Sequence, residues 1–508
     1  MNIQHFIKTK SIWIICLLSF LSALAYNEIN LKHLPKEKIR EGQTVITNDD
    51  YSYLKPAQNY LKTGEWKSDV LGNQAYFVRP PGYGVFYLSL IKITNSSSAL
   101  LLLKLIQYLL FSLSVYWLYH IIKSLTKSNT ISLITSAYYG LTPFAVGFLS
   151  YTLTEGITPA LVLLFIYLLF KANNCLTPKQ KNVLYFFAAI CFSYLLIARP
   201  QLGFIGILLP IFLIKDYYSS NKKRLIIYLV FFGSISFSLM TAWQVRNYNL
   251  TNKFNGLHSI YSSDNNSIYR PTFKEYWNFV GCWAQKGNVA HSYMVPLWQE
   301  GLKGDTSEIY IKNALITFPN RVIKFYGKQR LTEAFRKYQK SILNQKEYYD
   351  LKMAMPLTLP EIEFEVINEF KQLTSEYKKE FWFNYHIISP LKVFKVMTFH
   401  SNLSLHIFQN TYRGNWIIEA IRILCFGIHL AAFLILIISL LLFKQFDWKQ
   451  NSISITLFVY IFFLCYYQRG IEERYTLPIL PILMIGIASF IKHFYALGKS
   501  KLNTLKAN

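Results

Sequence analysis

Long, uninterrupted apolar runs constrain this chain more than any other feature of its sequence. Examples are "LIIYLVFFGSISFSLMTAW" at 225–243 and "TLPILPILMIGIASFI" at 476–491. A bilayer core about 30 Å thick needs about 20 apolar residues in a helix, and only helices or closed barrels pair every backbone polar group in lipid. Because the runs are continuous rather than alternating, they indicate helices. The sequence therefore predicts an all-α polytopic membrane protein.

Ten segments qualify as candidate spans, and we expect a bundle of about 10–12 helices. The segments are 11–29, 98–122, 130–149, 154–171, 182–198, 201–215, 225–243, 416–443, 452–468 and 476–493. The runs at 182–198 and 201–215 are short and separated by "RPQ", so they form either two short helices or one broken helix. The first run follows Lys8 and Lys10 but lacks a clear small-residue cleavage site, so we expect a retained signal anchor.

The formal net charge of +26 is distributed as in a membrane protein. Lysine and arginine concentrate in short segments between the apolar runs, which the positive-inside rule places in the cytoplasm. Both termini are then cytoplasmic, whereas the acidic motifs "NDD", "LTEG" and "GIEER" fall together on the external face. No nucleic-acid-binding signature is present, so anionic lipids or a lipid phosphate are the better partners for the surplus charge.

This topology divides the chain into three parts and places two long segments outside the membrane. Residues 1–243 form an N-terminal transmembrane module whose first external loop covers about 30–97. Residues 244–415 form an external, mostly helical segment, in which apolar residues recur at helical spacing over 357–370. Residues 416–508 form a C-terminal transmembrane module with a basic cytoplasmic tail.

Two adjacent aspartates, Asp49 and Asp50, open the stretch "TNDDYSYLKPAQNYLKTGEW" in the first external loop. Pro56 is tolerated only near a helix start, so we predict a helix that begins near Ser52, with Ser52 as its N-cap, and ends at Gly64. The carboxylates are then either a cap or solvated loop pair, or a pair that does chemistry. Adjacent carboxylates repel, which raises the pKa of one of them, and such a pair can deprotonate a hydroxyl or hold a divalent metal.

Two further charged residues of the external face each have two readings. Arg79 opens "RPPGYGVFY", a rigid turn before a segment that can lie along the membrane surface. Its planar guanidinium suits phosphate binding, or it snorkels to the surface. Glu155 lies at the external end of a span, where it is either functional because its burial is costly or a complement to the helix dipole.

The first external loop as a whole resembles that of the GT-C membrane glycosyltransferases. It is most similar to the bacterial relatives of dolichyl-phosphate-mannose–protein mannosyltransferases and to the lipid A aminoarabinose transferases. The family pattern is an Asp, a Tyr four residues on, an Ala four further, a Gly and then R-P-P-G-Y. Here the pattern is filled in order by Asp49, Tyr53, Ala57, Gly64 and Arg79–Tyr83.

Four more stretches resemble family motifs, in the family's order. They are "LTEG" at 153–156, "ARPQLGFIGILLP" at 198–210, "AWQVRNYNLTNKFNGLHS" at 242–259 and "GIEERYTLPILP" at 470–481. Ala198 stands where the family more often has threonine, and Ala242 replaces a proline. The resemblance covers about 30–260 and 450–495, whereas 270–440 matches no motif that we can name.

The resemblance implies inverting transfer of a sugar from a polyprenyl-phosphate donor, by direct displacement at the anomeric carbon. Asp49 is then the base on the acceptor, and Asp50 shares the site or orients the acceptor. The donor leaves as a lipid phosphate, so cations must stabilise the developing charge. The candidate cations are Arg474, Arg79, Arg246 and Arg199. Arg474 alternatively pairs with its neighbours Glu472 and Glu473. Candidates for contacting the acceptor or supporting the site are Glu155, Tyr53, Tyr83, Tyr475 and Glu473.

The sequence thus predicts a membrane glycosyltransferase that acts at the external face, which we expect to be the periplasmic face of a bacterial inner membrane. The acceptor is a lipid, a glycan or a protein, and the carboxylates permit a divalent cation without requiring one. One alternative is a polysaccharide polymerase or ligase, which relies on loop arginines rather than on an aspartate. Another is a lipid-linked-sugar flippase or transporter, which needs ionisable residues at mid-membrane depth, whereas those of this chain lie mostly at span ends.

Overall fold

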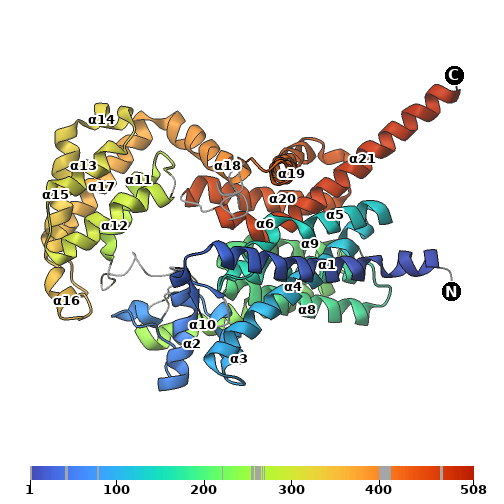
Figure 1. Cartoon of the computed structure of the whole chain (residues 1–508), viewed down its shortest axis with the longest axis horizontal. Helices are drawn as coiled ribbons and strands as arrows, with labels where there is room; N and C mark the ends of the chain where they lie inside the picture. Colours follow the sequence, from blue (N-terminus) through green and yellow to red (C-terminus); the bar gives the residue numbers. More distant parts are fainter. Residues whose placement is uncertain are drawn as a thin grey trace.

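The computed structural model describes residues 3–40, 44–47, 49–76, 79–219, 221–252, 254, 257, 265, 267, 269–285, 287–399, 414–469 and 473–507. One group of helices lies side by side in a bundle (Figure 1). They are α1 (Ile3–His33), α4 (Ser96–Thr126), α5 (Asn129–Leu141), α6 (Pro143–Val146), α7 (Thr158–Asn173), α8 (Pro178–Ala198), α9 (Leu208–Tyr217), α10 (Lys222–Thr251), α19 (Trp416–Leu441), α20 (Trp448–Phe463) and α21 (Leu480–Ala507). Shorter turns of 3-10 helix are η1 (Lys36–Lys38), η3 (Asn73–Tyr76), η4 (Thr154–Gly156), η5 (Pro200–Ile207), η9 (Phe443–Gln445) and η11 (Glu473–Ile479).

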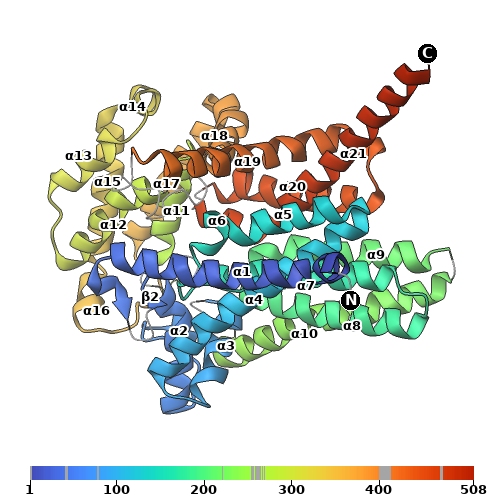
Figure 2. The same ribbon diagram turned by 45° about the vertical axis from the view of Figure 1, so that its right-hand side comes forward.

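A second group of helices stands at one end of the bundle, opposite the start of α1 and the end of α21 (Figures 1 and 2). It comprises α11 (Arg270–Gly281), α12 (Gly287–Lys303), α13 (Glu308–Ile316), α14 (Asn320–Tyr326), α15 (Lys328–Leu343), α16 (Lys346–Asp350) and α17 (Glu361–Glu380). A π-helical turn, η6 (Asn384–Ile388), and α18 (Ser389–Phe399) lead back to the bundle. A second π-helical turn, η10 (Leu464–Gln468), extends α20. The all-α prediction is confirmed.

Among the described residues, eight helices are long and apolar enough to cross a membrane. They lie within α1, α4, α8, η5–α9, α10, α19, α20–η10 and η11–α21. Apolar side chains such as Ile226, Val230 and Phe231 on α10 are exposed, and a water-soluble monomer rarely leaves so continuous an apolar surface uncovered. The chain is therefore an integral membrane protein.

Two of the ten predicted spans take a different form. The prediction of one continuous span over 130–149 is wrong, because the helix breaks between α5 and α6. The ring of Pro143 disfavours helical backbone at the preceding residue, and Thr142 is accordingly extended, with ψ of 133°. The span predicted at 154–171 begins at Thr158, and the resulting α7 has 16 residues.

A proline also decides between the alternatives left open at "RPQ". Arg199 is extended, with φ of −149° and ψ of 90°, directly before Pro200. The chain therefore forms two separate helical segments, α8 and η5–α9. At this break α8 meets α3 (Gly82–Ile91) so closely that a Cβ on Gly82 would lie 2.6 Å from the Ala198 backbone. The two small residues bring the "RPPGY" and "ARP" motifs together.

The loop between α1 and α4 contains the predicted helix, α2 (Asp50–Thr63), and a short antiparallel pair, β1 (Ile39–Arg40) and β2 (Thr44–Val45). Gly64 ends α2 with φ of +75°, as predicted. The prediction that Ser52 caps the start is wrong, because α2 begins two residues earlier. The Ser52 hydroxyl instead donates to the Asp49 carbonyl at 2.6 Å, and Pro56 lies inside the helix.

The second group of helices has its own aromatic core, which includes Tyr276, Phe335 and Phe370. Fully buried Arg270 donates to Glu363 at 2.9 and 3.2 Å, which joins α11 to α17. The apolar face predicted over 357–370 is partly wrong. Leu357 and Phe364 are exposed, and the buried face of α17 is Glu363, Val366, Ile367, Phe370, Leu373, Thr374 and Tyr377.

Candidate active site

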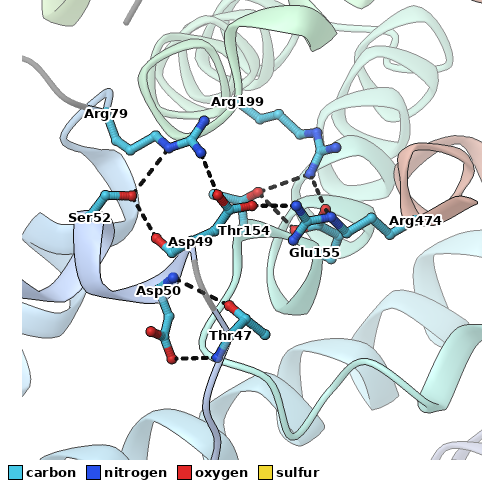
Figure 3. Close-up of polar contacts among 9 residues, drawn as sticks. All are labelled: Thr47, Asp49, Asp50, Ser52, Arg79, Thr154, Glu155, Arg199 and Arg474. Carbon is cyan, nitrogen blue, oxygen red and sulfur yellow. Dashed lines mark hydrogen bonds and ion pairs between the residues drawn. The ribbon is translucent and has the colours of Figure 1, made fainter. Parts of the chain in front are cut away.

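Asp49 is the residue directly before α2, and two arginines hold its carboxylate (Figure 3). Arg79 Nη2 donates to Oδ1 at 2.6 Å, and Arg474 Nη2 forms an ion pair with Oδ2. The Asp49 side chain remains 28% exposed. The aspartate is therefore bound from both sides but still accessible to a ligand.

A second carboxylate continues this arrangement. Glu155 in η4 is buried, and its Oε1 lies 2.8 Å from Arg199 Nη1 and 3.6 Å from Arg474 Nε. Arg474 thus lies between the two acids (Figure 3). The five side chains form an alternating series of three cations and two anions, Arg79–Asp49–Arg474–Glu155–Arg199, which we call the ion-pair series. The series carries a net charge of +1, so one bound monoanion would make it neutral.

Neighbouring residues hold the arginines at the two ends of the series. Arg79 Nε donates to the Ser52 hydroxyl at 3.2 Å, and its guanidinium lies 5.5 Å from the Tyr53 ring. Arg199 donates to the Thr154 hydroxyl at 2.9 Å and lies 5.1 Å from the Tyr475 ring. Both are cation–π distances. The tyrosines predicted at 53 and 475 therefore support the cations of the site.

The environment of Asp49 sets its protonation state. Burial alone would raise the pKa of the carboxyl, but Arg79 and Arg474 outweigh it and hold the pKa below the ordinary value for aspartate. Asp49 is therefore not the member of the pair whose pKa is raised. Asp49 is ionised at neutral pH.

Asp50 points away from the site although it is the next residue in the chain. It is buried, accepts from Thr152 Oγ1 at 2.8 Å and the Thr47 N–H at 3.1 Å, and pairs with Arg40. It does not line the cavity at Asp49. Successive residues on a helix point about 100° apart, which separates the two carboxylates. The structure therefore does not bring Asp50 to the predicted shared site.

The five residues of the ion-pair series all line a cavity of about 600 Å³. Its lining also contains the apolar side chains of Leu196, Phe204, Met240 and Phe463. A second, mostly apolar cavity of about 430 Å³ shares Pro200 and Phe204 with the first. It lies against α20 and is lined by Pro200, Gly203, Phe204, Ile207, Ile455, Thr456 and Val459. An anionic head with an apolar tail matches this combination.

Three predicted site residues lie elsewhere or outside the described part. Arg246 donates to the carbonyls of Tyr76 at 2.9 Å and Trp66 at 2.6 Å, in a separate cavity beside α10. Tyr83 is buried and donates to Gln107 at 2.8 Å. The Glu473 side chain lies outside the described residues, as does Glu472.

Sequence reasoning missed several polar residues in or beside the cavity. Thr154 lines it and bonds to Arg199, whereas Ser52 lies outside the lining and bonds to Arg79. Gln201 and Gln468 both line the cavity, and Gln201 donates to Gln468 at 3.1 Å. Thr154 and Gln201 lie within the motif stretches at 153–156 and 198–210, which was the available signal. Within the described ranges, no group of three His, Cys, Asp or Glu residues is placed to hold a metal ion.

No protein-family model matches the chain, and no curated protein matches it. Among solved structures, the chain is similar to ArnT from Cupriavidus metallidurans, in the apo state and bound to undecaprenyl phosphate. Each match has 11% sequence identity and a TM-score of 0.35, and covers 94% of this chain and 77% of ArnT.

Proposed function

We propose that this protein transfers a sugar from a polyprenyl-phosphate donor to an acceptor hydroxyl, with Asp49 as the base. The observation that carries the proposal is the ion-pair series, with its surplus positive charge, in a cavity whose lining also contains apolar side chains. The ordered motifs of the sequence independently support the same reaction class.

The lining of the two cavities suggests how the donor is oriented. Its phosphate lies between Arg474, Arg199 and Arg79, because guanidinium groups bind phosphate oxygens in a planar, bidentate manner. Its first isoprene units lie against Phe204 and continue into the apolar cavity beside α20. The remainder of the chain extends into the bilayer. This orientation places the anomeric carbon on the Asp49 side of the phosphate.

The proposed reaction is a single displacement. The acceptor oxygen attacks the anomeric carbon as its proton passes to an Asp49 oxygen. The bond from the anomeric carbon to the phosphate oxygen breaks, and its electron pair stays on the lipid phosphate, where the arginines stabilise the charge. Attack opposite the leaving group inverts the configuration.

Arg474 links donor binding to the strength of the base. In the free protein its ion pair with Asp49 makes the carboxylate a weak base. A donor phosphate competes for the same guanidinium, and each contact that Arg474 gives to the phosphate weakens its hold on Asp49. The pKa of Asp49 then rises toward the ordinary value, so the base gains strength only when a donor is present.

We place this site on the external face of a bacterial inner membrane, with both termini cytoplasmic. The short basic loops support this orientation. The start of α1 and the end of α21 also lie at the opposite end of the bundle from α11–α17 (Figure 2).

The proposal is tested in native membranes by mass spectrometry of polyprenyl-phosphate-linked sugars. Replacing Asp49 by Asn removes the base without changing its size, so the linked sugar should accumulate and transfer should stop. The Arg79→Ala variant should lose less activity than Asp49→Asn. A polymerase or ligase that depends on loop arginines would show the reverse ranking, and that result would replace the proposal.

A further inference from the structure

A further cavity, of about 740 Å³, lies between the second group of helices and the end of α20. Two π-helical turns, η6 and η10, contribute residues to it. They are linked by His386 Nδ1 and the Tyr466 hydroxyl, 2.5 Å apart. π-Helical turns are rare and occur frequently at functional sites, so two on one cavity indicate a shaped binding site rather than a packing gap.

The lining of this cavity combines aromatic rings with cations. Trp277, Tyr385, Tyr466 and Tyr467 contribute aromatic rings, while Asn278 and Ser375 contribute an amide and a hydroxyl. The charged lining residues are Lys371, Lys378 and Arg469 against Glu275, a surplus of two positive charges. Rings pack against the C–H faces of sugars, side-chain amides and hydroxyls bond to sugar hydroxyls, and cations bind carboxylate or phosphate substituents.

The cations of the lining differ in what they already hold. Arg469 is buried and donates to the carbonyls of Tyr466 at 2.7 Å, Tyr385 at 3.0 Å and Cys282 at 3.3 Å, so it fixes the cavity wall. Lys371 and Lys378 are exposed on α17. The two lysines are therefore the cations that a ligand meets.

This cavity adjoins the one that contains Asp49. Tyr467 and Gln468 line both, and Gln468 accepts from Gln201 of the Asp49 cavity at 3.1 Å. Tyr467 and Gln468 thus form the boundary between the two cavities, so a chain of sugars bound between the π-helical turns ends next to the Asp49 cavity.

We infer that the cavity between the π-helical turns binds the acceptor, and that the acceptor is an anionic oligosaccharide. This inference rests on the proposed function and names the acceptor that the sequence left open among lipid, glycan and protein. Lys371 and Lys378 bind its acidic groups, Trp277 packs against a sugar ring, and the terminal hydroxyl reaches Asp49.

The test uses the full-length protein in lipid nanodiscs and tetragalacturonate as the probe, with binding measured by calorimetry. The Lys371→Gln/Lys378→Gln double variant should raise the dissociation constant about tenfold, since two charge-assisted contacts are lost. The matched control is Lys340→Gln/Lys379→Gln, which removes the same charge from exposed lysines that do not line the cavity. The control should bind like the wild type, and tetragalactose and tetraglutamate should bind the wild type more weakly than tetragalacturonate.

Two results overturn the inference: equal affinities in the two double variants, or tetraglutamate bound as tightly as tetragalacturonate, which would indicate an acidic protein partner. Undecaprenyl phosphate binding, measured on the same samples by native mass spectrometry, separates this inference from the proposed function. If the wild type did not bind undecaprenyl phosphate, the donor assignment would be contradicted. If it bound undecaprenyl phosphate but not tetragalacturonate, only the acceptor assignment would be contradicted.

Discussion

Asp49 and Arg474 are separated by 425 residues in the chain and joined by an ion pair in the fold. Arg474 also lies 3.6 Å from buried Glu155, so one guanidinium faces two carboxylates. A ligand phosphate that draws Arg474 away changes the charge balance of both. The contact between Asp49 and Arg474 is thus the part of the site that the proposed donor phosphate affects most.

Replacing Arg474 by Gln should shift the pH dependence of transfer. The pKa of Asp49 is held below the ordinary value by two arginines, and loss of one leaves burial opposed by Arg79 alone, so that pKa rises. Because transfer needs ionised Asp49, the acidic limb of the kcat/KM profile moves to higher pH. Turnover also falls about 100-fold, as for loss of one group that stabilises the leaving charge. Arg474→Lys should shift the acidic limb less, because it keeps the positive charge. If the acidic limb did not move in Arg474→Gln, the ion pair between Arg474 and Asp49 would not control the pKa of Asp49.

Filling the apolar cavity beside α20 should affect long donors only. A Val459→Trp substitution places an indole in the cavity, whereas Phe458→Trp changes a neighbouring exposed residue that does not line it. Val459→Trp should weaken undecaprenyl phosphate binding about tenfold and leave an analogue with a single isoprene unit unaffected. Equal behaviour of the two variants in a native mass spectrometry titration would place the lipid chain elsewhere.

The pair between Arg270 and Glu363 should stabilise the second group of helices. Replacing Glu363 by Ala leaves a fully buried guanidinium without its carboxylate, which costs about 3–5 kcal/mol of unfolding free energy. Glu365 on the same helix pairs with Lys337 at the surface, at 3.5 Å, and Glu365→Ala should cost at most about 1 kcal/mol. Denaturant unfolding of the full-length protein measures both. Similar losses for the two variants would contradict the structural role of the buried pair.

Arg246 should contribute to stability rather than to donor binding. Its guanidinium holds the carbonyls of Trp66 and Tyr76 against α10 and lies 4.5 Å from the Trp243 ring. Arg246→Gln should lower the unfolding free energy by about 1–3 kcal/mol and leave undecaprenyl phosphate binding unchanged. Arg79→Gln should weaken that binding. If Arg246→Gln weakened it equally, the donor-binding role first predicted from the sequence would be restored.

The sequence predicted much of the site because the motif residues lie at span ends. Once the spans are placed, Asp49, Arg79, Glu155 and Arg199 must fall near one membrane face, and the turn containing Arg474 joins them. The pairing within the ion-pair series was not predictable, because it depends on the Pro200 break and on the close approach of α3 to α8.

The failures have equally local causes. Asp50 adjoins Asp49 in the sequence, but the helical rotation between them turns it toward Arg40. Pro56 predicted a later helix start than the one observed. The prediction failed because α2 tolerates the loss of one backbone hydrogen bond in its interior. In α17, the apolar residue Phe364 is exposed while charged Glu363 is buried. Glu363 can be buried because it pairs with Arg270, which lies 93 residues away in the sequence. Such long-range compensation leaves no periodic signal.

The adjacent aspartates provide the most direct test of the central claim that Asp49 is the catalytic base. Asp49→Asn and Asp50→Asn are the same chemical change at neighbouring positions, one in the cavity and one buried against Arg40. The measurement is sugar transfer per folded molecule, with unfolding of each variant recorded in parallel. Asp49→Asn should lower turnover at least about 100-fold with little loss of stability, whereas Asp50→Asn should lower stability and keep turnover within a few-fold of wild type. Wild-type turnover in Asp49→Asn would contradict the account.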